Sequence, residues 1–381
     1  MNEDLTLRPA DEAFEPIAHE TASDYAEPSL MEGLASKALR HGVPISVHLD
    51  LTYRCNERCI HCYLDHDDHG EMTTAEIKSL LDQLAAAGTL FLTLSGGEVL
   101  MRRDFFELLD HARKLMFCVK LKTNGVLIRE DQATRIAAAV VDSVQISVYS
   151  HRAEVHDAIT KRPGSLKRSL DAVRLLRSKG VKVYVANVLM TQNAADYPGV
   201  RALAEELDAI FVMDPTITPM MTGERGVLDL NIDRKALREV FRDPTVAGSV
   251  PDLCAPPKGP LSEDDALAAL PCSAGHTACY VSPYGDVYPC VQFPLPTGNL
   301  RKTPFLEIWR DSPQFAEVRA ISVSDLKGCS SCVHGSNCSR CPGLAYMEGD
   351  MRGPSVQDCE KSFARTGVPS VNLQKKWNLP K

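Results

Sequence analysis

The stretch Cys55-Asn-Glu-Arg-Cys59-Ile-His-Cys62 is the most informative part of this chain of 381 residues. It directly follows segment 45–52, which we expect to form a β-strand. A C-x₃-C-x₂-C loop places three thiols on one small concave surface. A structural zinc ion or a fully ligated four-iron cluster takes four protein ligands. Three cysteines therefore predict a metal centre with one open position, unless a fourth ligand from elsewhere closes a zinc site.

The sequence around this loop alternates short β-type runs with helical patterns. We expect strands at 45–52, 90–95, 117–123, 143–148, 182–190 and 209–214, and helices near 73–87, 103–115, 130–140, 165–179 and 194–207. Thr73 and Glu76 predict a capping box, and Gly88 and Gly180 predict helix ends. Alternation of this kind predicts parallel pairing through right-handed crossovers. The fold class is therefore α/β, and six such units fit a partial (β/α)6 TIM-type barrel. A doubly wound sheet is the alternative.

A second motif, Ser95-Gly96-Gly97-Glu98, ends the second expected strand. Paired glycines let a ligand approach the backbone closely, although such a pair by itself more often marks a turn. The Glu98 carboxylate is suited to bind an ammonium group. Active sites of barrel enzymes lie at the carboxyl ends of the strands, where both motifs are expected. We therefore expect the two motifs to belong to one site.

Together the motifs resemble the radical S-adenosylmethionine (SAM) superfamily over residues 45–225. The resemblance implies that Cys55, Cys59 and Cys62 hold a [4Fe–4S] cluster whose remaining iron binds SAM. It implies that the SAM amine lies at the glycine motif and that His61 lies near the adenine, although His61 also fits an ordinary loop position. Polar residues at later strand ends are implied for the SAM ribose and carboxylate, or else make only local hydrogen bonds: Asn124, Ser147 and Asn187.

The chain has 13 cysteines, and most of those outside the first loop lie toward the C-terminus. The alternation of strands and helices ends at about residue 225. Residues 251–260 are proline-rich and predict a linker. Segments 276–282 and 286–290 predict a hairpin, and 303–320 predicts a helix that carries Trp309. The region is rich in loops and is expected to bury little core, so a bound metal would have to stabilise it. Eight cysteines make two four-ligand sites, of zinc or of iron and sulfur: Cys272, Cys279, Cys290, Cys329, Cys332, Cys338, Cys341 and Cys359.

This region resembles the SPASM extension of radical SAM enzymes, although Cys338 and Cys341 are one residue closer than is usual. The resemblance implies two auxiliary iron–sulfur clusters with interleaved ligands. The nearer cluster would be held by Cys272, Cys279, Cys290 and Cys341. The outer cluster would be held by Cys329, Cys332, Cys338 and Cys359. Both are expected to be [4Fe–4S], and the nearer one could be [2Fe–2S] if Cys279 is not a ligand.

We therefore expect an acidic arm at 1–44, a radical SAM partial barrel at 45–225, a bridging region at 226–271, a SPASM domain at 272–360 and a tail at 361–381. Cys118 is predicted to be a buried thiol. Cys254 is either a bystander or an alternative ligand. Residues 1–29 carry a net charge of −7, which fits a solvated arm or a docking arm for a basic partner.

The composition excludes several functions. The formal net charge of −8 argues against a nucleic-acid protein. The sequence has no long apolar run for a membrane span and no export signal, so we expect the protein in the cytoplasm. In that reducing compartment, clustered cysteines are more often metal ligands than disulfides.

The resemblance implies an enzyme that cleaves SAM to a 5′-deoxyadenosyl radical, which removes a hydrogen atom from the substrate. We expect oxidative modification of a peptide, with side-chain cross-linking (C–C or thioether) in a ribosomally made precursor ranked first, as in the pyrroloquinoline quinone maturase. Expected partners are the peptide, a separate small recognition protein and a flavodoxin- or ferredoxin-type reductant. Alternatives are oxidation of a tetrapyrrole or sugar, formylglycine-type maturation, an electron carrier or a zinc scaffold. Candidates for handling the substrate, with no base assigned, are Tyr149, His151, His156, Asp214 and Arg225.

Overall fold

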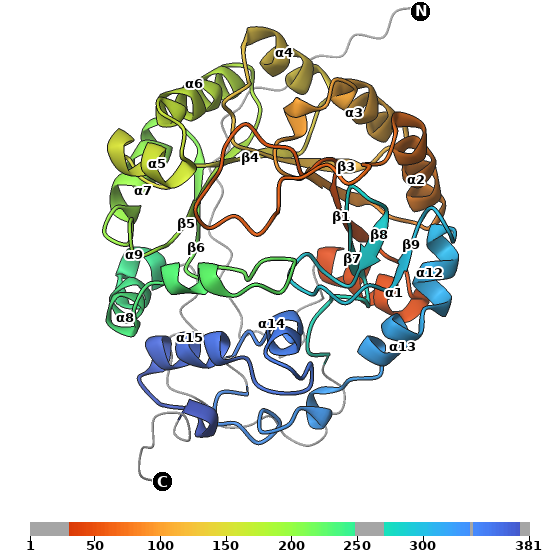
Figure 1. The fold of residues 1–381 in the computed structure, drawn as a ribbon, viewed down its shortest axis with the longest axis vertical. Coiled ribbons are helices and arrows are strands. Elements are labelled where there is room, and N and C mark those ends of the chain that lie inside the picture. The colour runs from red at the N-terminus through yellow and green to blue at the C-terminus, as the bar shows by residue number, and fades with distance from the viewer. Residues whose placement is uncertain (1–29, 248–269, 336–337, 374–381) are drawn as a thin grey trace, which may run out of the picture.

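The fold is built on one curved sheet that is covered by helices on its outer side (Figure 1). The structure, a computed structural model, describes residues 30–247, 270–335 and 338–373. Within these ranges the strand order is β6-β5-β4-β3-β2-β1-β7-β8-β9. The first six strands pair in parallel: β1 (Ser46–Asp50), β2 (Phe91–Ser95), β3 (Cys118–Thr123), β4 (Ser143–Ser147), β5 (Val183–Val188) and β6 (Ile210–Asp214).

Helices connect these strands: α2 (Thr74–Ala86), η1 (Val99–Met101), α3 (Phe105–Lys114), α4 (Glu130–Ala138), α5 (Ala153–Thr160), α6 (Ser165–Ser178) and α7 (Tyr197–Glu206). The expected strands and helices are confirmed to within a few residues at their ends. The sequential strand order excludes the doubly wound alternative, in which the order reverses at a switch point. The sheet ends at β6 and β9 without closing, so the partial barrel is confirmed.

The predicted capping box of α2 is also confirmed. Thr73 accepts from the N–H of Glu76 at 3.3 Å, and the Glu76 carboxylate accepts from the N–H of Thr73 at 2.7 Å. Gly88 and Gly180 adopt φ angles of +88° and +77° just past their helices, which is the left-handed conformation expected there.

The strands separate an apolar side that faces the helices from a polar inner side. On β1, Val47 and Leu49 are fully buried in the main core, whereas His48 lines a cavity on the inner side. On β3, Leu121 packs in the core and Lys122 lines the cavity. In closed barrels, branched apolar side chains fill the interior. Here the inner side chains are largely polar and leave a cavity where a closed barrel would be filled.

The C-terminal cysteine-rich region extends the main sheet. β7 (Ala278–Val281) pairs in parallel with β1, and it forms the expected hairpin with β8 (Asp286–Tyr288), which pairs with β9 (Gly298–Asn299). Phe305, Trp309 and Phe315 lie in the main core. The expectation that this region buries little core is therefore wrong for residues 278–319, because its apolar side chains pack against the barrel.

The single helix expected over 303–320 is also wrong. The structure has two helices, α12 (Phe305–Asp311) and α13 (Pro313–Arg319). Ser312 between them is extended, and its hydroxyl accepts from the N–H of Phe315 at 3.5 Å. A residue before proline is disfavoured in the helical region, so Pro313 starts a new helix rather than continuing the first one.

The remaining elements are α1 (Leu30–His41), η2 (Gly226–Leu230), α8 (Arg234–Arg242), α9 (Pro244–Ala247), η3 (Val323–Asp325), α14 (Pro342–Met347) and α15 (Val356–Thr366). Leu237, Val240 and Phe241 of α8 share a small apolar cluster with Ala364 of α15, so the bridging region contacts the C-terminal region. The expected domain boundary at residue 360 lies inside α15. The acidic segment 1–29, the linker 251–260 and Cys254 lie outside the described residues.

Candidate functional site

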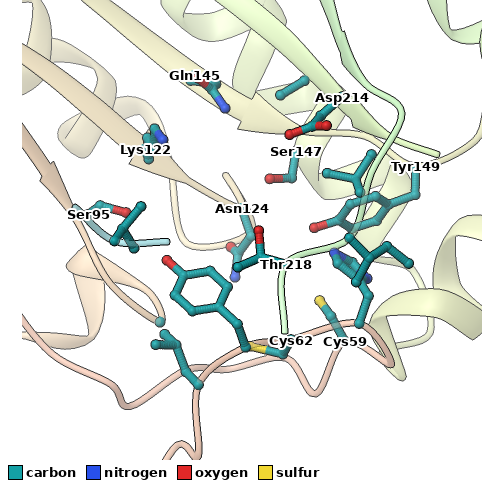
Figure 2. A pocket seen from close by; sticks show the side chains of 18 of the residues that line it. Cys59, Cys62, Ser95, Lys122, Asn124, Gln145, Ser147, Tyr149, Asp214 and Thr218 are labelled. Carbon is teal, nitrogen blue, oxygen red and sulfur yellow. The ribbon is translucent and has the colours of Figure 1, made fainter. Parts of the chain in front are cut away.

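The inner side of the sheet lines a cavity of ≈ 380 Å³ (Figure 2). The loop after β1 contributes Cys55, Cys59, His61 and Cys62 to its wall. Further wall residues come from the ends of the following strands and include those predicted for SAM: Ser95, Gly96, Gly97, Asn124, Ser147 and Asn187. The two sequence motifs therefore surround one space, with the exception of Glu98.

The cysteine loop is held in place by backbone hydrogen bonds. The N–H groups of Arg58 and Ile60 donate to carbonyl oxygens at the end of α5, at 3.0 Å each. Within the loop, the N–H of Glu57 lies 3.4 Å from Cys55 Sγ, and Asn124 Nδ2 lies 3.8 Å from the same sulfur. Donors directed at a sulfur stabilise a thiolate, and they tune the potential of a cluster that the thiolate holds.

The three thiols are half-buried and close enough to interact electrostatically with one another. Burial raises the pKa of Cys55 to about 12, and it also raises the pKa values of Cys59 and Cys62, with smaller contributions from neighbouring acids and thiols. Such thiols need a cation to ionise, which iron would provide. In the described part of the chain, no three side chains of the ligand type converge on a single-ion site. A four-iron cluster instead binds each cysteine through a separate iron, so its ligands surround a space.

The two glycines are required by the packing of the cysteine loop. The φ angle of Gly96 is +134°, and a Cβ atom there would lie 2.2 Å from the carbonyl oxygen of Thr52. A Cβ atom on Gly97 would lie 2.5 Å from the carbonyl oxygens of both Tyr53 and Arg54. The N–H of Gly97 donates to the Thr52 oxygen at 2.8 Å. The glycines thus bring the ends of β1 and β2 together, a role beyond the ligand access that the sequence predicted.

Glu98 is buried and is not part of the cavity wall. Its carboxylate accepts from the N–H of Leu100 at 3.1 Å, from Thr123 Oγ1 at 2.8 Å and from the N–H of Asn124 at 2.9 Å. Burial raises the pKa of Glu98, and these hydrogen bonds oppose the rise. In this arrangement Glu98 ties the end of β2 to the end of β3 and positions Asn124.

The part of the cavity wall formed by His61, Tyr149 and Asn187 suits an adenosine. His61 and Tyr149 meet edge to face, with ring centroids 4.7 Å apart. Burial lowers the pKa of His61 to about 4, so the imidazole is neutral near pH 7. Asn187 Nδ2 donates to the carbonyl oxygen of Val148 at 2.7 Å, whereas its Oδ1 is buried without a partner among the described residues. A neutral aromatic wall and an unpaired acceptor fit an adenine with its ribose hydroxyls.

A second cavity, of ≈ 200 Å³, lies in the C-terminal region. Its lining includes the four cysteines that the sequence grouped for the outer cluster: Cys329, Cys332, Cys338 and Cys359. Burial raises the pKa of Cys359 to about 12, with contributions from the other three thiols. The cation of Arg340 opposes the rise at Cys329. Four thiols around one space with a nearby cation fit an anionic cluster.

The cysteines grouped for the nearer cluster are arranged less uniformly. Cys290 interacts electrostatically with Cys272, and Cys341 interacts with Cys290. Cys279 lies on the helix-facing side of β7, opposite Val47 of β1, and is buried in the main core. Burial raises the pKa of Cys279, and the Arg319 cation beside it opposes this. That cation can offset a thiolate at Cys279.

Two residues that follow Cys290 connect the nearer group of cysteines with the main cavity. Gln292 and Val291, which follow Cys290, line the cavity. The side-chain amide of Gln292 lies 2.7 Å from Thr218 Oγ1, and its oxygen lies 3.9 Å from Cys341 Sγ. The cavity is thus bounded by the first cysteine loop at one place and by this glutamine at another.

The structure places two of the five candidates for substrate handling in the cavity wall and three outside it. Tyr149 and Asp214 line the cavity (Figure 2). His156 is buried behind Tyr149 and accepts from its N–H at 3.1 Å. His151 is exposed next to Gly199. Arg225 donates to the carbonyl oxygen of Met347 at 2.9 Å, away from the main cavity.

Sequence reasoning also misplaced or missed some residues. Cys118 is half-buried at the start of β3 instead of buried, because it lies on the side of the strand opposite the core residue Val119. The cavity residue His48 was missed, although alternation with Val47 and Leu49 could have revealed it. No local pattern points to Gln292, which reaches the cavity through tertiary packing alone.

Comparison with known proteins gives the family. A family model described as the radical SAM superfamily matches residues 49–203, and one described as SPASM, an iron–sulfur cluster-binding domain, matches residues 272–342. The chain belongs to the radical SAM superfamily. It is therefore an enzyme of the SAM-dependent, iron–sulfur type, as the resemblance predicted. Within the described ranges, each helix is too short or too polar to cross a membrane.

Several characterised relatives are similar over most of the chain. The mycofactocin maturase MftC of Mycobacterium ulcerans is 30% identical over 90% of this chain and 94% of its own length. The PqqA peptide cyclase of Xanthomonas oryzae is 30% identical, over 85% and 90%. The AdoMet-dependent heme synthase of Methanosarcina barkeri is 28% identical, over 80% and 92%.

The fold also matches solved structures. SuiB of Streptococcus suis bound to S-adenosylmethionine superposes with a TM-score of 0.66 at 18% identity, over 85% of this chain and 80% of that one. The complex of SuiB with its precursor peptide SuiA gives a TM-score of 0.67 at 17% identity, over 90% and 84%.

Proposed function

We propose that this radical SAM enzyme cross-links side chains of a ribosomally made precursor peptide through a C–C or thioether bond. One observation carries the proposal: a single cavity is bounded by the first cysteine loop and by Gln292, which contacts Cys341 of the nearer auxiliary group. A substrate there lies between a radical source and an electron acceptor, which is what an oxidative reaction needs. The names of two relatives, a mycofactocin maturase and a peptide cyclase, support a peptide substrate.

The proposed binding roles follow from the walls of the cavity. Cys55, Cys59 and Cys62 hold a [4Fe–4S] cluster, and the backbone from Ser95 to Gly97 faces the SAM amine, with Glu98 fixing that segment. When bound, the cluster and SAM supply a carbon radical that removes a hydrogen atom from the substrate. His61 and Tyr149 support the adenine, and the unpaired acceptor of Asn187, with Ser147, receives the ribose hydroxyls.

The auxiliary cysteines would hold two further clusters, with the grouping that the sequence predicted. Cys272, Cys279, Cys290 and Cys341 form the nearer site, as [4Fe–4S] or [2Fe–2S]. The outer site is supported by the cavity that its four cysteines share. A flavodoxin- or ferredoxin-type protein would supply electrons, and a separate small protein would present the peptide. The domain division at residues 44, 225, 271 and 360 stays a proposal.

A second candidate is oxidation of a tetrapyrrole. It is favoured by the similarity to the AdoMet-dependent heme synthase of Methanosarcina barkeri. The cavity is within the usual size range for small-molecule sites, roughly 300–1,000 Å³, so its volume does not decide between the two substrates.

The deciding experiment uses the anaerobically reconstituted protein with SAM, dithionite and a synthetic copy of any short peptide encoded beside the gene. Mass spectrometry should show loss of two hydrogens from the peptide and formation of 5′-deoxyadenosine. The matched control replaces Cys55, Cys59 and Cys62 together by Ala, which should abolish both products. The second candidate would be supported instead if SAM is cleaved, every peptide encoded beside the gene stays unchanged, and an added iron-containing tetrapyrrole is consumed.

A further inference from the structure

The inner wall of the main cavity carries a cation that the proposed chemistry does not use. Lys122 lies on β3, beside Gln145 of β4, and both side chains line the cavity (Figure 2). Burial lowers the pKa of Lys122, and the charges of Asp50 and Asp214 oppose the shift. Within the described residues, the structure records no hydrogen bond or ion pair of this ammonium group.

The acids near Lys122 are engaged elsewhere. Asp50 is fully buried and accepts from His48 Nε2 at 3.1 Å and from the Tyr280 hydroxyl at 2.9 Å. Asp214 accepts from the N–H and the hydroxyl of Thr216, at 3.0 and 2.9 Å. Both acids therefore act on Lys122 only at longer range. Lys122 is half-buried, and its ammonium group has no acceptor among the described residues, so a ligand that brings a carboxylate to the cavity gains binding energy there.

The depth of Lys122 distinguishes it from the residues expected to contact SAM. Asn124, at the end of β3, is two residues further along the chain, which corresponds to roughly 7 Å along a strand. Lys122 also interacts electrostatically with Cys290 of the nearer auxiliary group. An anion bound by Lys122 would therefore lie below the strand ends, between the two groups of cysteines.

We propose that Lys122 is the anion-binding subsite for the substrate and that it takes a carboxylate of the peptide segment that enters the cavity. The carboxylate accepts a charge-assisted hydrogen bond from the ammonium group, and the Gln145 amide beside it can donate a second one. This proposal rests on the proposed function and deepens it: the modified residue of the peptide lies close to an acidic side chain or to the peptide's C-terminus.

The test compares Lys122→Met with Lys120→Met in the reconstituted protein. Methionine keeps the unbranched side chain as far as the Cε position and removes the charged ammonium group. Lys120 lies two residues earlier on the same strand, is exposed and is not part of the cavity wall, so it is a matched control. Binding of SAM is measured by equilibrium dialysis. Binding of the precursor peptide is measured with SAM present, for the free acid, the C-terminal amide and variants with Asp or Glu changed to Asn or Gln.

Lys122→Met should bind SAM as the unaltered protein does and should bind the acidic peptide about 10- to 100-fold more weakly, the effect of one charged hydrogen bond. When the carboxylate that Lys122 binds is replaced by an amide, the unaltered protein and Lys120→Met should lose peptide affinity by the same factor. Lys122→Met should show no such loss. The peptide form that shows this loss identifies the carboxylate as a side chain or as the C-terminus.

Two results would overturn the assignment. Weaker SAM binding by Lys122→Met with unchanged peptide discrimination would mean that the lysine holds the carboxylate of SAM. A changed reduction potential of the nearer cluster with unchanged binding would mean that it balances cluster charge. If the unaltered protein modifies no peptide, the proposed function fails separately. Lys122 is then tested with N-acetylglutamate and N-acetylglutamine, and equal binding of the two would overturn the subsite.

Discussion

Single side chains behind the cavity wall control the groups that line it. His156 accepts from the backbone N–H of Tyr149, and its ring stacks on the Tyr149 ring with centroids 5.5 Å apart. Tyr149 in turn supports His61. Burial lowers the pKa of His156 to about 4, so the folded protein resists its protonation. The position of Tyr149 therefore depends on a neutral imidazole.

This dependence predicts a loss of stability in weak acid. Below the ordinary histidine pKa of about 6.5, the unfolded chain takes up a proton at His156 and the folded chain does not until about pH 4. His156→Asn keeps an acceptor for the N–H of Tyr149 and removes the titration. Between about pH 7 and pH 5.5 the unaltered protein should lose about 1 kcal/mol more unfolding free energy than the variant, measured by urea unfolding. Equal losses would show that His156 is protonated as freely in the folded state as in water.

Gln292 gives a second prediction at this scale. A cluster-bound sulfur is an acceptor, so with iron present the amide of Gln292 should turn its N–H toward Cys341 and accept from the Thr218 hydroxyl. Donors to a cluster sulfur stabilise the reduced state and raise the potential. Gln292→Leu should therefore lower the potential of one auxiliary cluster in a redox titration followed by EPR. Thr218→Val removes the hydroxyl but keeps the amide donor of Gln292, so it should leave the cluster potential nearly unchanged. Equal shifts of the potential in both variants would refute the role of the amide.

At the scale of elements, five barrel helices end in the same way: α2, α3, α4, α6 and α7. The residue after the C-cap adopts a left-handed conformation, and it is Gly88, Met116, Val140, Gly180 or Asp208. Glycine adopts this conformation without strain, whereas a β-branched residue does not. The same left-handed turn thus recurs after these helices, but the residues at that position differ in how easily they adopt a positive φ angle.

Val140→Gly should consequently stabilise the protein by about 0.5–1 kcal/mol, because the relief of strain exceeds the entropy that glycine adds to the unfolded chain. The Val140 side chain is 69% exposed, so little packing is lost. Gly180→Ala is the matched reverse change: no atom lies within 4 Å of the added Cβ atom, and only strain is introduced. It should destabilise by about 1 kcal/mol in thermal unfolding. A destabilising Val140→Gly would mean that the left-handed turn is not strained.

The elements also show how far sequence reasoning extends. Alternation and helical periodicity located the six barrel strands, since each strand buries one face against helices. The short helix α5 was missed because it has only eight residues and precedes α6 after a brief turn. The pairing of β7 with β1 could not be predicted, since no local pattern in Ala278–Val281 records which distant strand it joins. The cysteine motifs were found because their spacing is local, whereas the cavity residue Gln292 was not.

At the scale of the molecule, the iron content reports on the two auxiliary groups together. Three [4Fe–4S] clusters would give about 12 iron atoms per chain. Cys279→Ala should reduce this to about 8, because Arg319 is placed to offset a thiolate at that position. Cys118→Ala, which removes a half-buried thiol at the far end of the barrel, should keep all the iron. Full iron in both variants would mean that the nearer cluster has only three cysteine ligands.

The pairing of β1 with β7 has a consequence for how the protein is made. Ser46 pairs with Ala278, so the ribosome must synthesise most of the chain before the open edge of β1 is covered. Until then an unpaired strand edge, followed directly by the three thiols of the first cysteine loop, is available to other chains. We therefore expect rapid overproduction without a matching supply of iron and sulfide to favour aggregation over the mature enzyme.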